Sequence, residues 1–299
     1  MPARPTILVV NGRKVRQPVF VIGAPHSGVG LLARALKQAP GLHLTIGQRS
    51  VMSVVYAFAR SPSIQRGRDE AAATVLRDAF AQAWQVTPHA CLDCSPDCRS
   101  AGGVAGAGSC AVERDITRYG DATPELMYCA EAVVDAFPDA RIVQLIRDGR
   151  DVTAAMLGDA QELGFFRRAM ASAQSEFPNP FFGIETEQDL AAWPGLSPAG
   201  QSAMRWLGSV RQMARLRSSL AAEQLTTLRY EQLVRHPGSA FAAVSAFIGA
   251  EVRPVRAGRA QGPAPALEPG AWRRLLSPAQ LAEFEKVAGT ELRRVGYGG

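Results

Sequence analysis

The stretch "VFVIGAPHSGVGLLARAL", residues 19–36, constrains the fold more than any other part of the chain. Residues 19–22 form an apolar run rich in β-branched side chains, bounded by Pro18 and Gly23, which predicts a buried strand. Leucines and alanines then recur at helical spacing over residues 28–38. A strand, a glycine-rich turn and a helix in this order point backbone N–H groups at one position, so the stretch predicts an anion-binding loop.

The same alternation of strand and helix returns twice. Residues 140–146 predict a strand between two helical patterns, and residues 226–229 predict another, followed by two short helices. We therefore expect an α/β fold of three layers, a parallel sheet with helices on both faces. We expect a single domain over residues 1–299, with insertions at about 87–112 and 158–200, and a last helix at about 278–292.

The loop at residues 23–30 differs from a nucleotide phosphate loop. Gly23 and Gly28 have the G-x4-G spacing, but Val29 and Gly30 stand where a Walker loop has Lys and Ser or Thr. No side chain at these two positions reaches a γ-phosphate or holds Mg²⁺, which argues against an ATPase or GTPase. A βα turn with glycines can also bind nothing, and the loop alone does not decide between the two.

The charge of the chain favours an anionic ligand. Lys and Arg number 33 against 27 for Asp and Glu, a formal net charge of +6, and they are scattered rather than gathered in runs. Scattered basic residues favour a small anion over nucleic acid. No stretch approaches the roughly 20 apolar residues of a membrane span. The apolar stretch at residues 7–10 is too short for a signal peptide, so we expect a cytoplasmic protein without a membrane span.

A second anion-binding element follows the strand at residues 140–146. Arg147 and Arg150 lie in the turn after it, and guanidinium groups bind phosphate oxygens in pairs. Asp148 and Asp151 are placed to orient these arginines or to cap the next helix. The turn is also compatible with a solvated cluster of ion pairs that contributes little.

Together these motifs resemble a known family. The segments "PVFVIGAPHSGVGLLARAL", "YGDATPELMY", "FPDARIVQLIRDGRDVTAAM", "LRYEQLVRHP" with "FIG", and "GAWRRLLS" are similar to those of bacterial-type sulfotransferases that use 3′-phosphoadenosine 5′-phosphosulfate (PAPS), in the same order. The resemblance spans about residues 17–296. It implies a P-loop-like sulfotransferase fold and transfer of a sulfuryl group from PAPS to a hydroxyl or amine of a small-molecule or glycan acceptor. The donor-binding positions that it implies are Gly23, Ala24, Pro25, His26, Ser27, Gly28, Val29, Gly30, Arg147, Ala155 and Tyr230.

The chain departs from that family pattern at several site positions. His26 stands where the family usually has Arg or Lys, and Ala122 and Ala155 stand where it often has Lys and Ser. Gln48 stands where many members have an acidic general base, and glutamine cannot accept a proton. Candidate substitutes for the base are His26, His43, Asp121 and Glu125. We also expect His26, as the one cationic side chain of the loop, to contact the phosphosulfate in its protonated form.

Three functions remain compatible with the sequence. The first is a working sulfotransferase with a substitute base. The second is a catalytically impaired relative that binds a nucleotide or a partner, and the third is an enzyme of the same fold that acts on another phosphorylated substrate.

Four cysteines occur close together in the first insertion. Cys91, Cys94, Cys98 and Cys110 have the spacing C-x2-C-x3-C-x11-C, which suits a structural zinc site of four thiolates. Free thiols in a loop or a redox-active pair are the alternatives. Cys129 lies in an apolar helical pattern and predicts a core position. The aromatic residues between 165 and 193 predict either an acceptor pocket or, as we prefer, a packed core.

Overall fold

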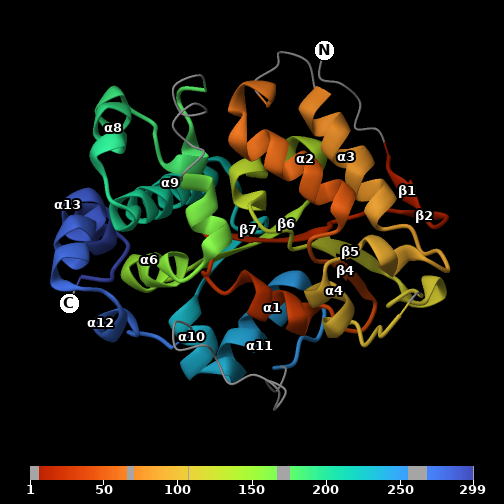
Figure 1. Cartoon of the computed structure of the whole chain (residues 1–299). Coiled ribbons are helices and arrows are strands. Elements are labelled where there is room, and N and C mark those ends of the chain that lie inside the picture. The colour runs from red at the N-terminus through yellow and green to blue at the C-terminus, as the bar shows by residue number, and fades with distance from the viewer. Residues whose placement is uncertain (1–6, 66–70, 107, 167–175, 255–267, 299) are drawn as a thin grey trace.

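The computed structural model describes residues 7–65, 71–106, 108–166, 176–254 and 268–298 (Figure 1). Its main sheet has five parallel strands in the order β4-β5-β3-β6-β7. These strands are β3 (Val19–Gly23), β4 (Leu42–Thr45), β5 (Arg118–Asp121), β6 (Arg141–Ile146) and β7 (Leu225–Arg229). A separate two-stranded antiparallel sheet pairs β1 (Val9–Val10) with β2 (Arg13–Lys14).

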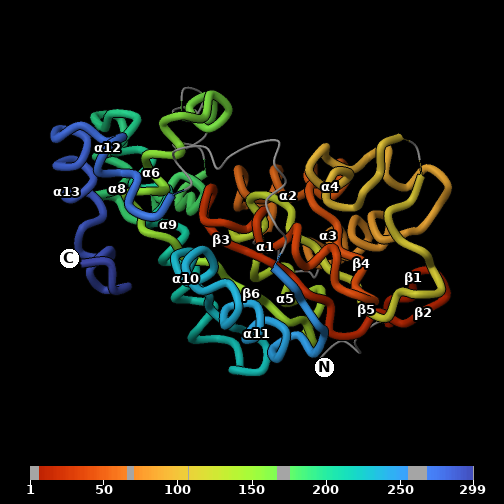
Figure 2. The backbone as a smooth tube through the Cα atoms, turned by 90° about the horizontal axis from the view of Figure 1, so that it is seen from below, coloured from red at the N-terminus to blue at the C-terminus, as the bar shows by residue number. Residues whose placement is uncertain are grey.

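Helices cover both faces of the sheet, as Figures 1 and 2 show. One face carries α2 (Arg49–Arg60), α3 (Ala71–Ala83), α5 (Ala130–Ala136) and α9 (Pro198–Ser219). The other carries α1 (Val29–Leu36), α4 (Pro96–Ala101), α10 (Tyr230–Arg235) and α11 (Pro237–Ile248). Packed around α9 and beyond it are α6 (Gly149–Leu157), α8 (Glu187–Ala192), α12 (Trp272–Leu275) and α13 (Pro278–Arg294). The described 3-10 turns are η1 (Pro62–Ile64), η2 (Ala90–Asp93), η3 (Glu113–Asp115), η4 (Leu126–Cys129), η5 (Pro180–Phe182) and η6 (Trp193–Gly195).

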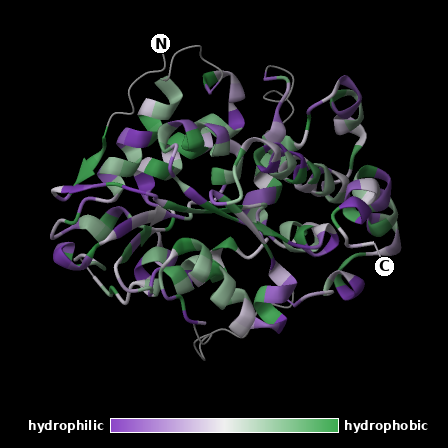
Figure 3. Ribbon diagram, turned by 180° about the vertical axis from the view of Figure 1, so that it is seen from behind, coloured by the Kyte–Doolittle hydropathy of each residue, from purple (hydrophilic) through white to green (hydrophobic). Residues whose placement is uncertain are grey.

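The central strand β3 explains why the sheet is buried on both sides. Its side chains alternate between faces, so Phe20 and Ile22 pack in one apolar cluster while Val19 and Val21 pack in the other. All five residues of β3 are buried. Figure 3 shows the apolar colouring concentrated along the strands and the helix faces that cover them. The predicted three-layer α/β fold is therefore confirmed.

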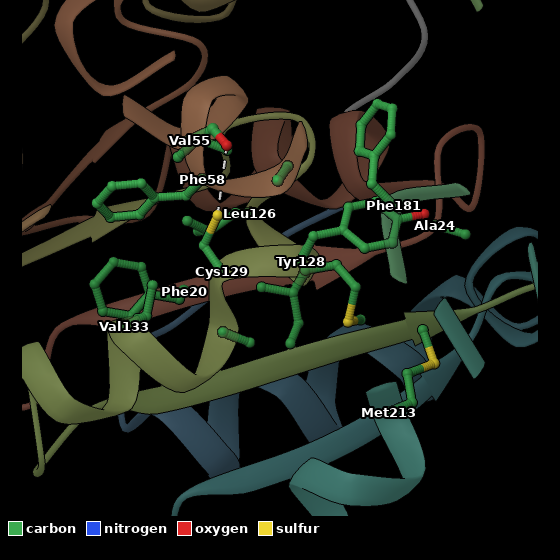
Figure 4. Packing of buried hydrophobic residues seen from close by; sticks show 14 of the residues in the cluster. Phe20, Ala24, Val55, Phe58, Leu126, Tyr128, Cys129, Val133, Phe181 and Met213 are labelled. Atoms are coloured by element: carbon green, nitrogen blue, oxygen red, sulfur yellow. Dashed lines mark hydrogen bonds between the residues drawn. The ribbon is translucent and has the colours of Figure 1, made fainter. Parts of the chain in front are cut away.

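The larger cluster contains Cys129 and most of the aromatic residues that the sequence predicted for the core, together with residues of α9. Cys129 is fully buried, and its thiol donates to the backbone oxygen of Val55 at 3.5 Å (Figure 4). Trp206 and Met213 lie on the buried face of α9. The aromatic side chains of the second insertion that join this cluster are Phe165, Phe166, Phe181, Phe182 and Trp193. Packing is therefore the observed role of these five rings, while Phe177 is exposed.

Sequence patterns located three of the five strands of the main sheet. The strands β4 and β5 were missed, because "LHLT" alternates over only four residues and "RYGD" contains neither an apolar run nor an alternation. Both lie on one side of β3 in the sheet order. The last helix ends at Arg294, two residues beyond its predicted end. Within the described residues, no helix is long and apolar enough to cross a membrane.

Helix α9 packs so closely on η5 that its backbone requires a glycine. A Cβ at Gly208 would stand 2.5 Å from the backbone oxygen of Pro180 and 2.7 Å from Cα of Gly183. We predict that Gly208→Ala lowers the free energy of unfolding by about 1–3 kcal/mol, since these are backbone atoms that cannot move cheaply. In Gly238→Ala, the matched change in α11, the new Cβ meets nothing within 4 Å, so alanine should be neutral or stabilising by up to about 1 kcal/mol. Urea denaturation measures both, and equal effects would contradict the packing argument.

Candidate functional site

The predicted site residues meet at one edge of the sheet. Because the five strands run parallel, their carboxyl ends lie together, and each is followed by a turn that carries polar side chains. Gly23 ends β3, Asp121 ends β5, Arg147 follows β6 and Tyr230 follows β7. The loop, the arginine turn and the tyrosine are thus assembled from three adjacent strands of the sheet.

The loop at residues 23–28 is held tightly between β3 and α1. Gly28, the N-cap of α1, has a φ of 102°, and a Cβ there would stand 2.4 Å from the ring of Tyr230. The Ser27 amide donates to the Ala24 oxygen at 3.1 Å and closes a turn. No side chain caps α1, and its N-terminus follows the loop directly, where backbone N–H groups at a helix start are available to a ligand. This geometry suits an anion with oxygens close to the backbone.

Arg147 joins the loop to the rest of the edge. Its guanidinium is fully buried and donates to the backbone oxygen of His26 at 2.9 Å. It also lies over the ring of Tyr230, 4.4 Å from the centroid, and 3.9 Å from the carboxylate of Asp151. A charged group buried at this depth requires such contacts, because burial without them is costly. Arg147 therefore fixes the loop and places a positive charge beside it.

His26 occupies a constrained position in the loop. Its φ of 59° is in the left-handed region, and its Nε2 lies 3.5 Å from the carboxylate of Asp159. Burial lowers the pKa of His26 below 6.5, Asp159 acts in the opposite direction, and Arg205 and Arg147 lower it further. The imidazole is therefore mainly neutral at neutral pH in the ligand-free protein. The sequence predicted a protonated His26 in contact with a bound phosphosulfate. For that anion-bound state, protonation of His26 stays a prediction.

An ion network lies directly behind His26. Arg205, fully buried in α9, contacts Glu125 at 2.6 Å and Glu162, and its guanidinium lies 4.1 Å from the ring centroid of Phe181. Burial works against its charge, but Glu125 raises the pKa of Arg205. One ligand atom each from His26, Asp159 and Glu162 lies within 4.8 Å of the others, a possible metal-binding group. Because Arg205 already pairs with Glu162, a cation at that position would have to displace it.

The other candidate bases lie in different surroundings. Asp121 is fully buried, with one carboxylate oxygen 2.5 Å from the Thr45 hydroxyl and the other 2.7 Å from the Thr123 amide. Burial raises the pKa of Asp121 to about 7. His43 is buried in β4, and burial together with Lys37 lowers its pKa to about 4. His43 therefore belongs with the cysteine segment rather than with the loop.

The family model for sulfotransferases matches residues 18–254. The chain belongs to the sulfotransferase family. The match covers the loop, the arginine turn and Tyr230, which are the elements that meet at the sheet edge. Family membership supports sulfuryl transfer as the general activity of this transferase. Among curated protein sequences, none matches the chain.

Several solved structures are similar to this sulfotransferase. The sulfotransferase domain of the Synechococcus PCC 7002 olefin synthase is 17% identical, with a TM-score of 0.49 over 92% of this chain and 94% of that one. A sulfotransferase from Alicyclobacillus acidocaldarius is 18% identical, with a TM-score of 0.43 over 94% of this chain and 100% of that one. A mouse sulfotransferase solved in complex with PAP is 14% identical, with a TM-score of 0.44 over 96% of this chain and 88% of that one.

The late segment "GAWRRLLS" is also bound to this edge. Asp151 accepts hydrogen bonds from the backbone amides of Gly270 and Trp272 at 2.7 and 2.9 Å. The guanidinium of Arg150 pairs with Asp148 and stacks 4.2 Å from the ring centroid of Trp272. The arginine turn of the sulfotransferase therefore holds two chain segments far apart in sequence. Residues 255–267, which precede the late segment, lie outside the described residues.

The four cysteines of the first insertion come together, as free thiols. The Cys110 amide donates to the Cys91 sulfur at 3.2 Å, and Lys37 Nζ donates to the Cys110 sulfur at 3.1 Å. A hydrogen bond from Cys94 and the nearby Lys37 ammonium lower the pKa of Cys98 to about 6, although burial opposes this.

Three polar residues of the site were missed by sequence reasoning: Asp159, Glu162 and Arg205. Asp159 and Glu162 fall in the second insertion, whose pattern gave no sign of contact with the loop. Arg205 did carry a signal, because it stands between Met204 and Trp206 on a helix and so had to be buried with a partner.

Gln48 has a structural role at the position where the family often has a base. Its side-chain oxygen accepts from the amides of Ser50 at 2.8 Å and Val51 at 3.3 Å, which caps the N-terminus of α2. Ala122 and Ala155, the other departures, are buried small side chains.

We predict that Gln48→Ala lowers the free energy of unfolding by about 0.5–2 kcal/mol, the usual effect of losing a helix cap. Gln48→Glu keeps the accepting oxygen and adds a negative charge at the helix N-terminus, so it should retain the stability of the wild type. Chemical denaturation compares the three proteins. If the alanine variant were as stable as the wild type, Gln48 would not be the cap of α2.

Proposed function

We propose that this sulfotransferase transfers a sulfuryl group from PAPS to a hydroxyl or amine of a small-molecule or glycan acceptor. The observation that supports it best is the position of Arg147, whose buried guanidinium joins the loop to the ring of Tyr230. In this proposal the backbone of residues 23–30 binds the 5′-phosphosulfate and Arg147 binds the 3′-phosphate. PAPS has no γ-phosphate, which agrees with a loop that lacks the Walker lysine.

The transfer step requires little covalent chemistry from the protein. The acceptor oxygen or nitrogen attacks sulfur in line, the bond from sulfur to the bridging phosphate oxygen breaks, and adenosine 3′,5′-bisphosphate leaves. Catalysis then depends on positioning and on donors near the nonbridging oxygens. The loop amides and Arg147 are the described groups suited to these tasks.

For the acceptor proton we propose His26 as the general base, oriented by Asp159. Its lowered pKa keeps the imidazole able to accept a proton, and the carboxylate 3.5 Å away would stabilise the imidazolium that forms. Asp121 is less suited, since both of its oxygens already accept hydrogen bonds in the core. Glu125 is paired with Arg205.

We predict that Arg147→Ala weakens binding of adenosine 3′,5′-bisphosphate by about 1.5–3 kcal/mol, the value of a hydrogen bond to a charged group. Arg147→Lys keeps the charge but not the paired donors, so its affinity should be intermediate. Calorimetric titration measures both, with Arg217→Ala, an exposed arginine of α9, as the control. Wild-type affinity in a folded Arg147→Ala protein would remove Arg147 from the donor site.

We predict that kcat/KM rises with pH and reaches a plateau above the pKa of His26, which lies below 6.5, because the base must be deprotonated to act. Turnover in His26→Asn should fall by about 10²–10⁴-fold. Asparagine tolerates the left-handed backbone at this position, so the variant isolates the loss of the imidazole. An unchanged profile in His26→Asn would exclude it as the base. Donor affinity that falls as pH rises through the same range would instead assign His26 the role of a charged anion partner.

A binding assay and a turnover assay together distinguish this proposal from a catalytically impaired relative. A thermal shift with adenosine 3′,5′-bisphosphate reports donor-site binding, and mass spectrometry of products formed from PAPS and a cell extract reports transfer. Binding with transfer supports the proposal, and binding without any sulfated product supports the impaired relative. The absence of both would favour another phosphorylated substrate.

A further inference from the structure

The sulfurs of the four insertion cysteines form a continuous chain of contacts. The Cys110 amide donates to the Cys91 sulfur at 3.2 Å, and Cys94 lies close enough to interact with both Cys91 and Cys98. Lys37 Nζ donates to the Cys110 sulfur at 3.1 Å and lies close to Cys98, so that Lys37 and the four cysteines form a ring. Cys91 and Cys98 are buried, and the other two cysteines are partly buried. Four thiols from three separate turns of the chain are thus gathered around one position.

Nitrogen donors are directed at these sulfurs. Cys91 accepts from the Cys110 amide, Cys98 accepts from the Ile46 amide, and Cys110 accepts from Lys37 Nζ. Such N–H···S bonds stabilise thiolates, as they do around metal-bound cysteines. A disulfide carries no charge that would need these donors. Four cysteine sulfurs are the donor set that a soft divalent cation such as zinc prefers.

We propose that Cys91, Cys94, Cys98 and Cys110 bind one structural zinc ion, with Lys37 as the charged group that hydrogen-bonds to the metal-bound sulfurs. This proposal is independent of PAPS and of the acceptor. The sulfurs do not form the closed group of ligand atoms within 4.8 Å that His26, Asp159 and Glu162 form. No three of the four sulfurs lie within 4.8 Å of one another, so zinc binding requires them to move closer together.

The zinc site would connect the cysteine segment to the sheet and to the helix of the anion-binding loop. Lys37 is the C-cap of α1 and also donates to the Leu44 oxygen at 2.7 Å. The Ser95 hydroxyl, which caps α4 between two of the cysteines, donates to the Ile46 oxygen at 2.6 Å. Through Lys37 and Ser95, the cysteine segment is attached both to the end of α1 and to the residues that follow β4. A zinc ion held by four cysteine ligands fits a structural role rather than a catalytic one.

The test is the metal content of the protein purified under reducing conditions and without a metal-affinity column. We expect about one zinc per chain by mass spectrometry of the digested protein, released when a mercurial reagent modifies the thiols. Cys98→Ser should lose the zinc and melt at a lower temperature. Cys129→Ala is the matched control, because Cys129 packs against α2 away from the ring, and it should retain the zinc.

Lys37→Met tests the role assigned to the ammonium. Zinc should remain in this variant, but its affinity in a competition with a chromogenic chelator should fall by about 10–100-fold, as for other partners of metal ligands. Mercurial-induced release needs only the wild-type protein, so the test does not depend on the variants folding. Wild-type protein that holds no zinc and titrates as free thiols would overturn the proposal, and so would two disulfides found in its place.

Discussion

The buried guanidinium of Arg147 is the group on which the arrangement of the site depends. It donates to the backbone of the loop at His26, stacks on Tyr230 and approaches Asp151, so that the turns after β3, β6 and β7 contact one charge. Asp151 in turn binds the amides of Gly270 and Trp272 and fixes the late segment of the chain. Burial of a charged group at this depth is costly without such partners.

The tight packing around that charge explains two glycines of the loop. A side chain at Gly28 would enter the ring of Tyr230, and one at Gly23 would stand 2.4 Å from the Ser27 hydroxyl. The loop can therefore approach an anion with its backbone, while His26 is left as its one ionisable side chain. The absence of a lysine in the loop is compatible with anion binding, because Arg147 supplies positive charge from the neighbouring strand.

Sequence patterns were sufficient for the architecture and for the groups that follow long apolar strands. The loop and the arginine turn come directly after apolar strands, and Tyr230 follows the more exposed strand β7. The sequence connected the three only through the family resemblance, and the parallel sheet explains why they lie at one edge. The strands β4 and β5 are short, and their identity depends on pairing within the sheet, of β5 with β3 and of β4 with β5, rather than on local propensity. The contact of His26 with Asp159 joins residues more than a hundred positions apart, and no local pattern reports it. Gln48 shows the reverse case, in which a departure from a family pattern has a clear structural role as a helix cap.

The residues that depart from the family pattern have different roles in the structure. Gln48 caps α2, and Ala155 is a buried residue of α6. His26 lies beside the carboxylate of Asp159, a contact that the sequence did not predict. A change of base from the α2 terminus to the loop would keep the proton acceptor close to the transferred group. The cysteine segment contacts the other end of α1, where Lys37, the C-cap of the helix, donates to the Cys110 sulfur.

The central claim is that the loop and Arg147 form one binding site for the two phosphates of the donor. The measurement that tests it most directly is a crystal structure of the protein with adenosine 3′,5′-bisphosphate. We expect the 5′-phosphate against the amides of residues 23–30 and the 3′-phosphate within hydrogen-bonding distance of Arg147. A nucleotide bound elsewhere, or bound at this edge without contact to Arg147, would contradict the account.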